Sequence, residues 1–166
     1  MKYIIDEMKP EDWKQVAAIY LEGIEGGNAT FETEVPSWEK WDNGHFQCCR
    51  LVARKDSNVL GWIALSPTST RKCFSGVAEV SIYIGSAYTG QGIGKSLLTK
   101  LIEISENNGF WSLQSVIMKE NITSINLHEG RGFRNLGIKE KIAQMDNGTW
   151  RDVVLMERRS KLIGID

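Results

Sequence analysis

Residues 77–102 read VAEVSIYIGSAYTGQGIGKSLLTKLI, which predicts a strand, a glycine-rich turn and a helix in direct succession. Over residues 77–84 the side chains alternate between two faces, as they do in a β-strand, and Glu79 is the one acid among them. Residues 93–102 repeat apolar side chains at the spacing of an amphipathic helix. This strand–turn–helix unit is the most informative segment of the chain.

Glycines at positions 90, 92 and 94 remove side chains from the turn that opens this helix. The first N–H groups of a helix have no partner inside it, and the helix dipole adds partial positive charge there. Such a turn can hold a pyrophosphate, although a glycine turn by itself is as often only structural.

Two well-known nucleotide motifs do not fit the turn. A P-loop needs glycine five residues before Gly94-Lys95-Ser96, and that position is Thr89. A dinucleotide-binding turn would need its last glycine at Lys95, and it follows the first strand of its domain. In this chain several predicted helices and strands precede the turn, so it does not follow the first strand.

Working outward, the pattern predicts eleven helices and strands in the order β-α-α-β-β-β-α-β-α-β-β, which is an α+β or mixed α/β layout. We see no linker and no repeat, so we expect one domain over residues 1–166. The expected strands are 3–5, 50–54, 59–65, 77–84, 113–118 and two between 133 and 157 around Asp146-Asn147-Gly148. The expected helices are 10–24, a short one from Pro36-Ser37, 93–107, and one capped by Asn121 that ends at Gly130 or Gly132.

Composition narrows the class of protein. Of 166 residues, 42% are hydrophobic and 25% charged, as in an ordinary globular domain. A net charge of −1 gives no overall basic field for nucleic acid or a membrane surface. The N-terminal residues MKYIIDE include two acids before any long apolar stretch, which is not the pattern of a secretory signal. The three cysteines form no disulfide framework. We therefore expect a cytoplasmic protein with no nucleic-acid or membrane partner and no metal.

The turn and its neighbours resemble the GNAT acetyltransferases, in the phosphinothricin acetyltransferase-like branch. Residues 90–98, GQGIGKSLL, resemble the acyl-CoA motif Arg/Gln-x-x-Gly-x-Gly/Ala, with Thr89 in place of the usual Arg/Gln. The match continues in 29–33 (ATFET), 61–67 (GWIALSP), 78–84 (AEVSIYI) and 121–133 (NITSINLHEGRGF). Four separated motifs in order, over residues 2–158, are far more specific than one.

The resemblance implies a GNAT fold, a bent mixed sheet of about seven strands flanked by about four helices. The sheet would split between two parallel strands, 77–84 and 113–118, and coenzyme A would lie in the split. Because Thr89 replaces the usual Arg/Gln, one side-chain contact with the cofactor is lost, whereas the main-chain contacts with the cofactor remain. The implied contacts with acetyl-CoA are the main chain at Ile82, Tyr83 and Ile84, the turn Thr89, Gly90, Gln91, Gly92, Ile93, Gly94 and Lys95, and Asn121 and Ser124.

Two residues are candidates for the chemistry. Glu79 is the candidate general base, acting directly or through water, because burial in an apolar strand raises a carboxyl pKa. The alternative is an exposed or salt-bridged strand residue. His128 stands where the branch often has a histidine that serves the leaving thiolate, and the alternative is a packed, hydrogen-bonded ring.

The acceptor pocket is expected to use Phe31, Glu32, Trp62 and Arg71. Arg71 or Lys72 could hold an acceptor carboxylate, and both could equally be solvated loop charges. Aromatic residues such as Trp62, Tyr83 and Trp150 are core residues by default. Trp150 and Asp152 match the branch's C-terminal strand, for which dimer contact and substrate contact are both open. Relatives in this branch are commonly dimers, so the resemblance implies a homodimer.

The resemblance therefore predicts an acetyl-CoA-dependent N-acetyltransferase for a small amine. The preferred acceptor is the α-amine of an amino acid or analogue, such as phosphinothricin, methionine sulfone or methionine sulfoximine. A polyamine, an aminoglycoside or a protein N-terminus remains open. So does a non-catalytic acyl-CoA-binding module, because fold alone does not fix function.

Overall fold

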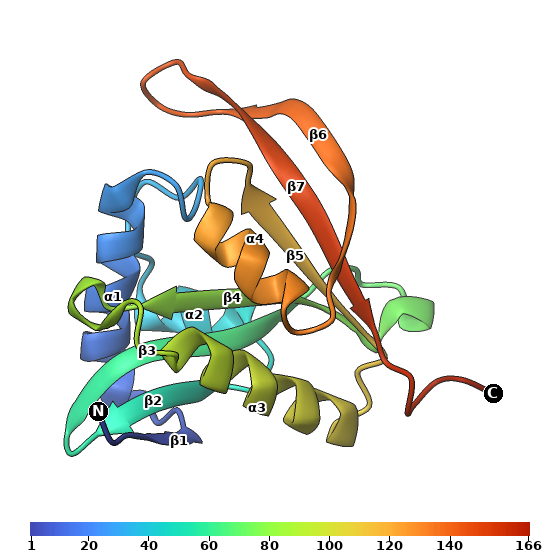
Figure 1. Cartoon of the computed structure of the whole chain (residues 1–166), viewed down its shortest axis with the longest axis horizontal. Coiled ribbons are helices and arrows are strands. Elements are labelled where there is room, and N and C mark those ends of the chain that lie inside the picture. Colours follow the sequence, from blue (N-terminus) through green and yellow to red (C-terminus); the bar gives the residue numbers. More distant parts are fainter.

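The computed structural model describes residues 1–166 and contains the eleven predicted helices and strands in the predicted order (Figure 1). The strands are β1 (Ile4–Glu7), β2 (Leu51–Lys55), β3 (Asn58–Pro67), β4 (Val77–Ile84), β5 (Ser112–Met118), β6 (Arg134–Gln144) and β7 (Trp150–Arg159). The helices are α1 (Trp13–Gly26), α2 (Trp38–Gly44), α3 (Ile93–Asn107) and α4 (Ile122–Glu129).

The first helix begins later than predicted. Pro10–Asp12 form a separate 3₁₀ turn, and α1 starts at Trp13. The side chain of Asp12 explains the interruption, because its Oδ2 accepts a 2.9 Å hydrogen bond from Lys9 N while both its oxygens bind the guanidinium of Arg54. The carboxylate therefore stays at the turn, which is fixed to β2.

The seven strands form one sheet in the order β1-β2-β3-β4-β5-β7-β6. Every neighbouring pair is antiparallel except β4 and β5, the parallel pair that the resemblance implied. These two strands are in register only over Val77–Glu79 and Ser112–Gln114. Beyond that point they separate, and Figure 1 shows β5 turning away from β4. The bent mixed sheet of the GNAT fold is confirmed.

Helices cover both faces of the sheet. The larger core packs Leu97, Leu98 and Leu101 of α3 against one face, and the smaller packs Val16 and Ile19 of α1 with Trp41 of α2 against the other. Burying one such leucine contributes about 1.5–3 kcal/mol relative to exposure. The cores fix α3 and α1 on opposite sides of the strand that leads into the split.

Strand β3 lies between the two cores. Its residues 59–65 are all buried, so the segment lacks the alternation of a strand with one wet face. Leu60, Ile63 and Leu65 point into the larger core, whereas Trp62 and Ala64 point into the smaller. No helix of the structure is long and apolar enough to cross a membrane.

Candidate active site

A cavity of about 430 Å³ opens where β4 and β5 separate. One wall is β4 from Glu79 to Tyr83, and the opposite wall is β5 from Ser115 to Met118. The start of α4 and the loop at 29–32 complete one end, while Gly44, His45 and Ser66 form the other. The split therefore brings together segments from most of the length of the chain.

Glu79 lies at the apex of the split, where β4 and β5 begin to separate. It is the last residue of β4 that is paired with β5, and its side chain is only partly buried. Its carboxylate forms no ion pair and no hydrogen bond within the protein, and burial raises its pKa above the ordinary value for glutamate. A carboxylate in this state can accept a proton from a group in the cavity.

His128 of α4 also lines the cavity, with 1% of its surface exposed. Its Nδ1 is 2.7 Å from the carbonyl oxygen of Ser124, and a carbonyl can only accept, so Nδ1 carries the hydrogen. Nε2 is buried without a partner, and burial lowers the pKa of the ring. His128 is therefore neutral, and its Nε2 can accept a hydrogen bond but can donate a proton only after protonation.

The edge of β4 beyond Glu79 offers main-chain groups to the cavity. From Val80 to Ile84 this strand is paired with β3 on one side only. An extended ligand could therefore bond to its free edge as an additional strand would. Ile82 and Tyr83 line the cavity, whereas Ile84 packs against the larger core.

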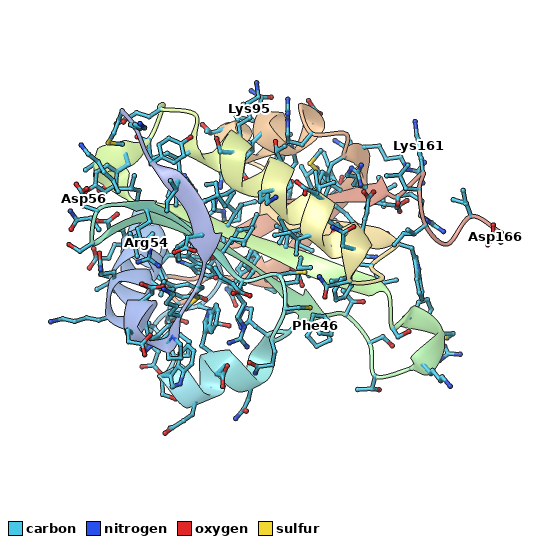
Figure 2. The ribbon with its side chains drawn as sticks, turned by 90° about the horizontal axis from the view of Figure 1, so that it is seen from below. Phe46, Arg54, Asp56, Lys95, Lys161 and Asp166 are labelled. Carbon is cyan, nitrogen blue, oxygen red and sulfur yellow. The ribbon has the colours of Figure 1, made fainter.

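The glycine turn lies next to this edge. Gly92 caps α3 with φ +79°, a left-handed conformation that favours glycine. The first paired main-chain donor of the helix is Ser96 N, which bonds to Gly92 O at 3.1 Å, so the preceding N–H groups have no acceptor. An anion fits these donors. Lys95, in the first turn of α3, projects at the edge of the molecule (Figure 2). In the same view Phe46, which follows α2, lies beside that helix.

Asn121 caps α4 as predicted, but its side chain makes a second contact. Its Oδ1 accepts from Ser124 N at 3.3 Å, and its Nδ2 donates to Asn28 O at 3.2 Å. Both polar groups of the side chain are thus engaged within the protein. Asn121 ties the loop at 29–32 to the opposite wall, in addition to lying at the cavity.

Arg151 of β7 holds the same loop. Its guanidinium donates to Gly27 O at 2.8 Å, to Asn28 Oδ1 at 2.6 Å and to Glu120 Oε2 at 2.9 Å. Phe31 and Glu32, which follow, line the cavity, and their contact with the acceptor stays a prediction. The position of both residues therefore depends on a strand more than 100 residues away in the chain.

Two predicted acceptor residues do not lie on the cavity wall. Trp62 has no exposed surface, and its ring packs against those of Tyr20 and Tyr83 at centroid distances of 5.8 and 4.9 Å. It supports the wall from behind. Arg71 lies on an exposed loop with its guanidinium 5.6 Å from the ring centre of Phe74, outside the cavity lining.

Four cavity or loop residues escaped the sequence analysis. His45 and Ser66 line the end of the cavity beyond Glu79, and Ser115 carries a buried hydroxyl without a partner. Arg151 controls the loop without lining the cavity. Only Ser66 stands in one of the quoted motifs, 61–67, and its register opposite Glu79 is what places it at the cavity.

Comparison with known proteins adds independent evidence. The profile of the acetyltransferase (GNAT) family matches residues 11–133. YwnH of Bacillus subtilis, which carries a provisional phosphinothricin acetyltransferase name, is 36% identical over 140 residues, covering 81% of this chain and 86% of its own. Phosphinothricin N-acetyltransferase of Alcaligenes faecalis is 30% identical over 161 residues, covering 91% and 79%.

A solved structure agrees over nearly the whole chain. The phosphinothricin acetyltransferase of Sinorhizobium meliloti, in complex with AcCoA, superposes with a TM-score of 0.84 at 28% identity. The superposition covers 96% of this chain and 89% of that one.

Proposed function

The chain belongs to the acetyltransferase (GNAT) family, and from this premise we propose that it acetylates the α-amine of a small amino acid or analogue. It is an N-acetyltransferase that uses acetyl-CoA. The proposed acceptors are of the phosphinothricin, methionine sulfone or methionine sulfoximine type. The observation that carries the proposal is the position of Glu79. Its partly buried carboxylate has no ion-pair or hydrogen-bond partner, and it stands where β4 and β5 separate beside a cavity of about 430 Å³.

The residues around the split fit acetyl-CoA. The free edge of β4 near Ile82 and Tyr83 can bond to the amides of pantetheine, and the N–H groups after Gly90 can bind pyrophosphate. Acetyl-CoA supplies an activated thioester carbonyl, and an N–H near Ile82 can stabilise charge on its oxygen. Because the pantetheine and the pyrophosphate of acetyl-CoA are both held, the protein contributes chiefly by positioning the thioester for attack.

Glu79 acts as the general base in this proposal. The acceptor arrives as an ammonium and must lose a proton before its nitrogen can attack. The free carboxylate can take that proton directly or through water, and its raised pKa brings it closer to working pH. At the thiol end, the neutral Nε2 of His128 has no hydrogen to give to the departing thiolate, so His128 serves the thiolate only after Nε2 has accepted a proton.

Charge at the cavity wall supports one alternative acceptor. The wall carries Glu32 and Glu79 but no lysine or arginine, so a cationic amine would be attracted and a carboxylate would find no cation there. This distribution of charge supports a polyamine as the second candidate acceptor. An amino acid acceptor needs Arg71 or another basic group beside the cavity.

We also propose that the protein is a homodimer of the cytoplasm, where its three free cysteines stay reduced. Strand β6 is exposed along nearly its whole length, and the β6–β7 hairpin projects from the rest of the molecule (Figure 1). Four of its apolar side chains are exposed, namely Leu136, Ile138, Ile142 and Trp150. A second copy could cover them, and light scattering during gel filtration tests this.

Acceptor profiling tests the proposed function. Thiol release from acetyl-CoA is measured with phosphinothricin, methionine sulfone, common amino acids, spermidine, an aminoglycoside and a peptide N-terminus. Turnover confined to the amino acids and their analogues supports the proposal, whereas turnover confined to spermidine supports the alternative. If no amine of the panel causes thiol release while coenzyme A still binds in calorimetry, the result supports a non-catalytic binding module.

A further inference from the structure

His45 is a titratable side chain at the end of the cavity beyond Glu79, and nothing described so far uses it. It follows α2 and lines the same cavity as Glu79, on the side away from His128 and α4. Its side chain is partly buried, and the adjoining Gly44 is exposed. His45 therefore lies between the interior of the cavity and solvent.

The ring of His45 is held in one orientation. Its Nδ1 lies 2.6 Å from the carbonyl oxygen of Trp41, so Nδ1 carries a hydrogen and donates it. The ring also stacks on the indole of Trp41, with centroids 4.1 Å apart. In the neutral ring Nε2 then carries a lone pair, has no partner in the protein and is not among the fully buried polar atoms.

Arg50 fixes the segment that carries the ring. It is buried, and it donates to Phe46 O at 2.6 Å, to His45 O at 3.1 Å and to Asp42 Oδ1 at 2.5 Å. The guanidinium also lies 5.0 Å from the centre of the Trp41 ring. The position of His45 is therefore set by a network rather than by a free loop.

A row of three side chains leads from the base to this histidine. Ser66 of β3 is directly opposite Glu79 of β4 in the antiparallel register, which places the two side chains on one face about 4.5–5.5 Å apart at Cβ. Phe46 N bonds to Leu65 O at 2.9 Å, which ties the residue after His45 to the residue before Ser66. All three members of the row, His45, Ser66 and Glu79, line the cavity.

Acetyl transfer to an ammonium group releases one proton to solvent in each turnover. As an ammonium becomes an amide, the C–N bond forms, the C–S bond breaks and the nitrogen loses two protons. The departing thiolate gains one proton, so one more leaves for solvent in each turnover. A carboxylate that takes the first proton must give it up before it can take the second, so a separate route for the first proton keeps the carboxylate free.

We propose that His45 Nε2 takes the first proton from the acceptor's ammonium group and releases it to solvent, which leaves Glu79 to take the second proton and return it to the departing thiolate. This inference rests on the proposed function. Burial and the nearby cation Arg50 lower the pKa of His45, whereas Asp42 and the Trp41 carbonyl raise it. Glu79 is the other ionisable group on that side of the cavity. A ring that is neutral at working pH can accept a proton and lose it again within a turnover.

The test uses H45N, because an asparagine amide can still donate to Trp41 O but has no group at the position of Nε2. The wild type, H45N and the control N43A, which changes an exposed neighbour, are assayed with the best acceptor from the panel. The pH runs from about 6 to about 10, across the ordinary amine range. We expect kcat/KM of H45N to be about 10–100-fold lower at neutral pH and to approach wild type once the acceptor amine is deprotonated in solution.

The outcomes separate this inference from the proposed function. A wild-type to H45N ratio that stays constant over pH, or stays at one, overturns the role of His45 while the transferase remains. No wild-type turnover with any amine overturns the proposed function and this inference with it. H45Q, whose amide can accept a hydrogen bond but no proton, must show the same pH-dependent loss. Coenzyme A binding in calorimetry confirms that each variant is folded.

Discussion

Glu79 of β4 and Gln114 of β5 are the last residues in register between the two parallel strands. Up to this pair the strands share a ladder, and beyond it the cavity begins. The base in our proposal therefore stands at the apex of the split, where a rigid paired strand supports it from one side and the cavity receives its side chain on the other.

Replacing Glu79 by glutamine tests its assignment as the base. Because burial raises the pKa of Glu79, the rate should rise with pH through a value above the ordinary glutamate pKa, as the carboxylate becomes available. E79Q should lower kcat about 10²–10⁴-fold and remove this rising limb. Initial rates over pH measure both effects. A variant that retains the wild-type pH profile would exclude the assignment.

Gly92 is the sensitive position of the proposed pyrophosphate turn. Its φ of +79° costs an alanine about 1–2 kcal/mol, and the same change disturbs the free N–H groups at the start of α3. G92A should lower the melting temperature and weaken coenzyme A binding in calorimetry. The matched control is G26A in α1, which has open space for a methyl group and ordinary φ, and should leave binding unchanged.

Loss of Arg151 should affect the acceptor rather than the cofactor. The guanidinium holds Gly27 and Asn28, and charged hydrogen bonds of this kind contribute about 1.5–3 kcal/mol. R151A should raise the acceptor KM about tenfold or more through the loop that carries Phe31 and Glu32. R134A, which removes an exposed arginine from the neighbouring strand, serves as the control. An equal rise for both variants would contradict the role given to Arg151.

Gly23 of α1 tests how closely the cavity wall is packed. A Cβ at this position would lie 2.7 Å from Cδ1 and Cε1 of Tyr83, and that ring is already stacked on Trp62. G23A should therefore displace the tyrosine from the wall and cost about 1–3 kcal/mol of stability. Thermal unfolding and acceptor KM measure the two effects. Unchanged values for both would mean that the ring moves freely.

The order of the elements was predictable because its signals are local. Gly26-Gly27-Asn28 ends α1, the cap at Asn121 starts α4, and Asp146-Asn147-Gly148 separates the last two strands. Each depends on a few adjacent residues. The parallel pairing of β4 and β5 came only from the family resemblance, because periodicity says nothing about strand direction.

Contacts between distant segments explain what the sequence could not predict. The face that Trp62 occupies was hidden because β3 is buried on both sides and reads as one apolar run. Asn121 was predictable as a cap, but its bond to Asn28 spans 93 residues. His45 reached the cavity through the network around Arg50, and no local pattern marks it.

The most direct test of the central claim is the stoichiometry of one reaction with the best acceptor. Thiol release and acetylated amine are quantified together, by a thiol reagent and by mass spectrometry, for the wild type and E79Q. We predict equal amounts of the two products for the wild type and slow formation of both for E79Q, with coenzyme A binding retained. Thiol release without an acetylated amine, or equal rates for the two proteins, would contradict transfer through Glu79.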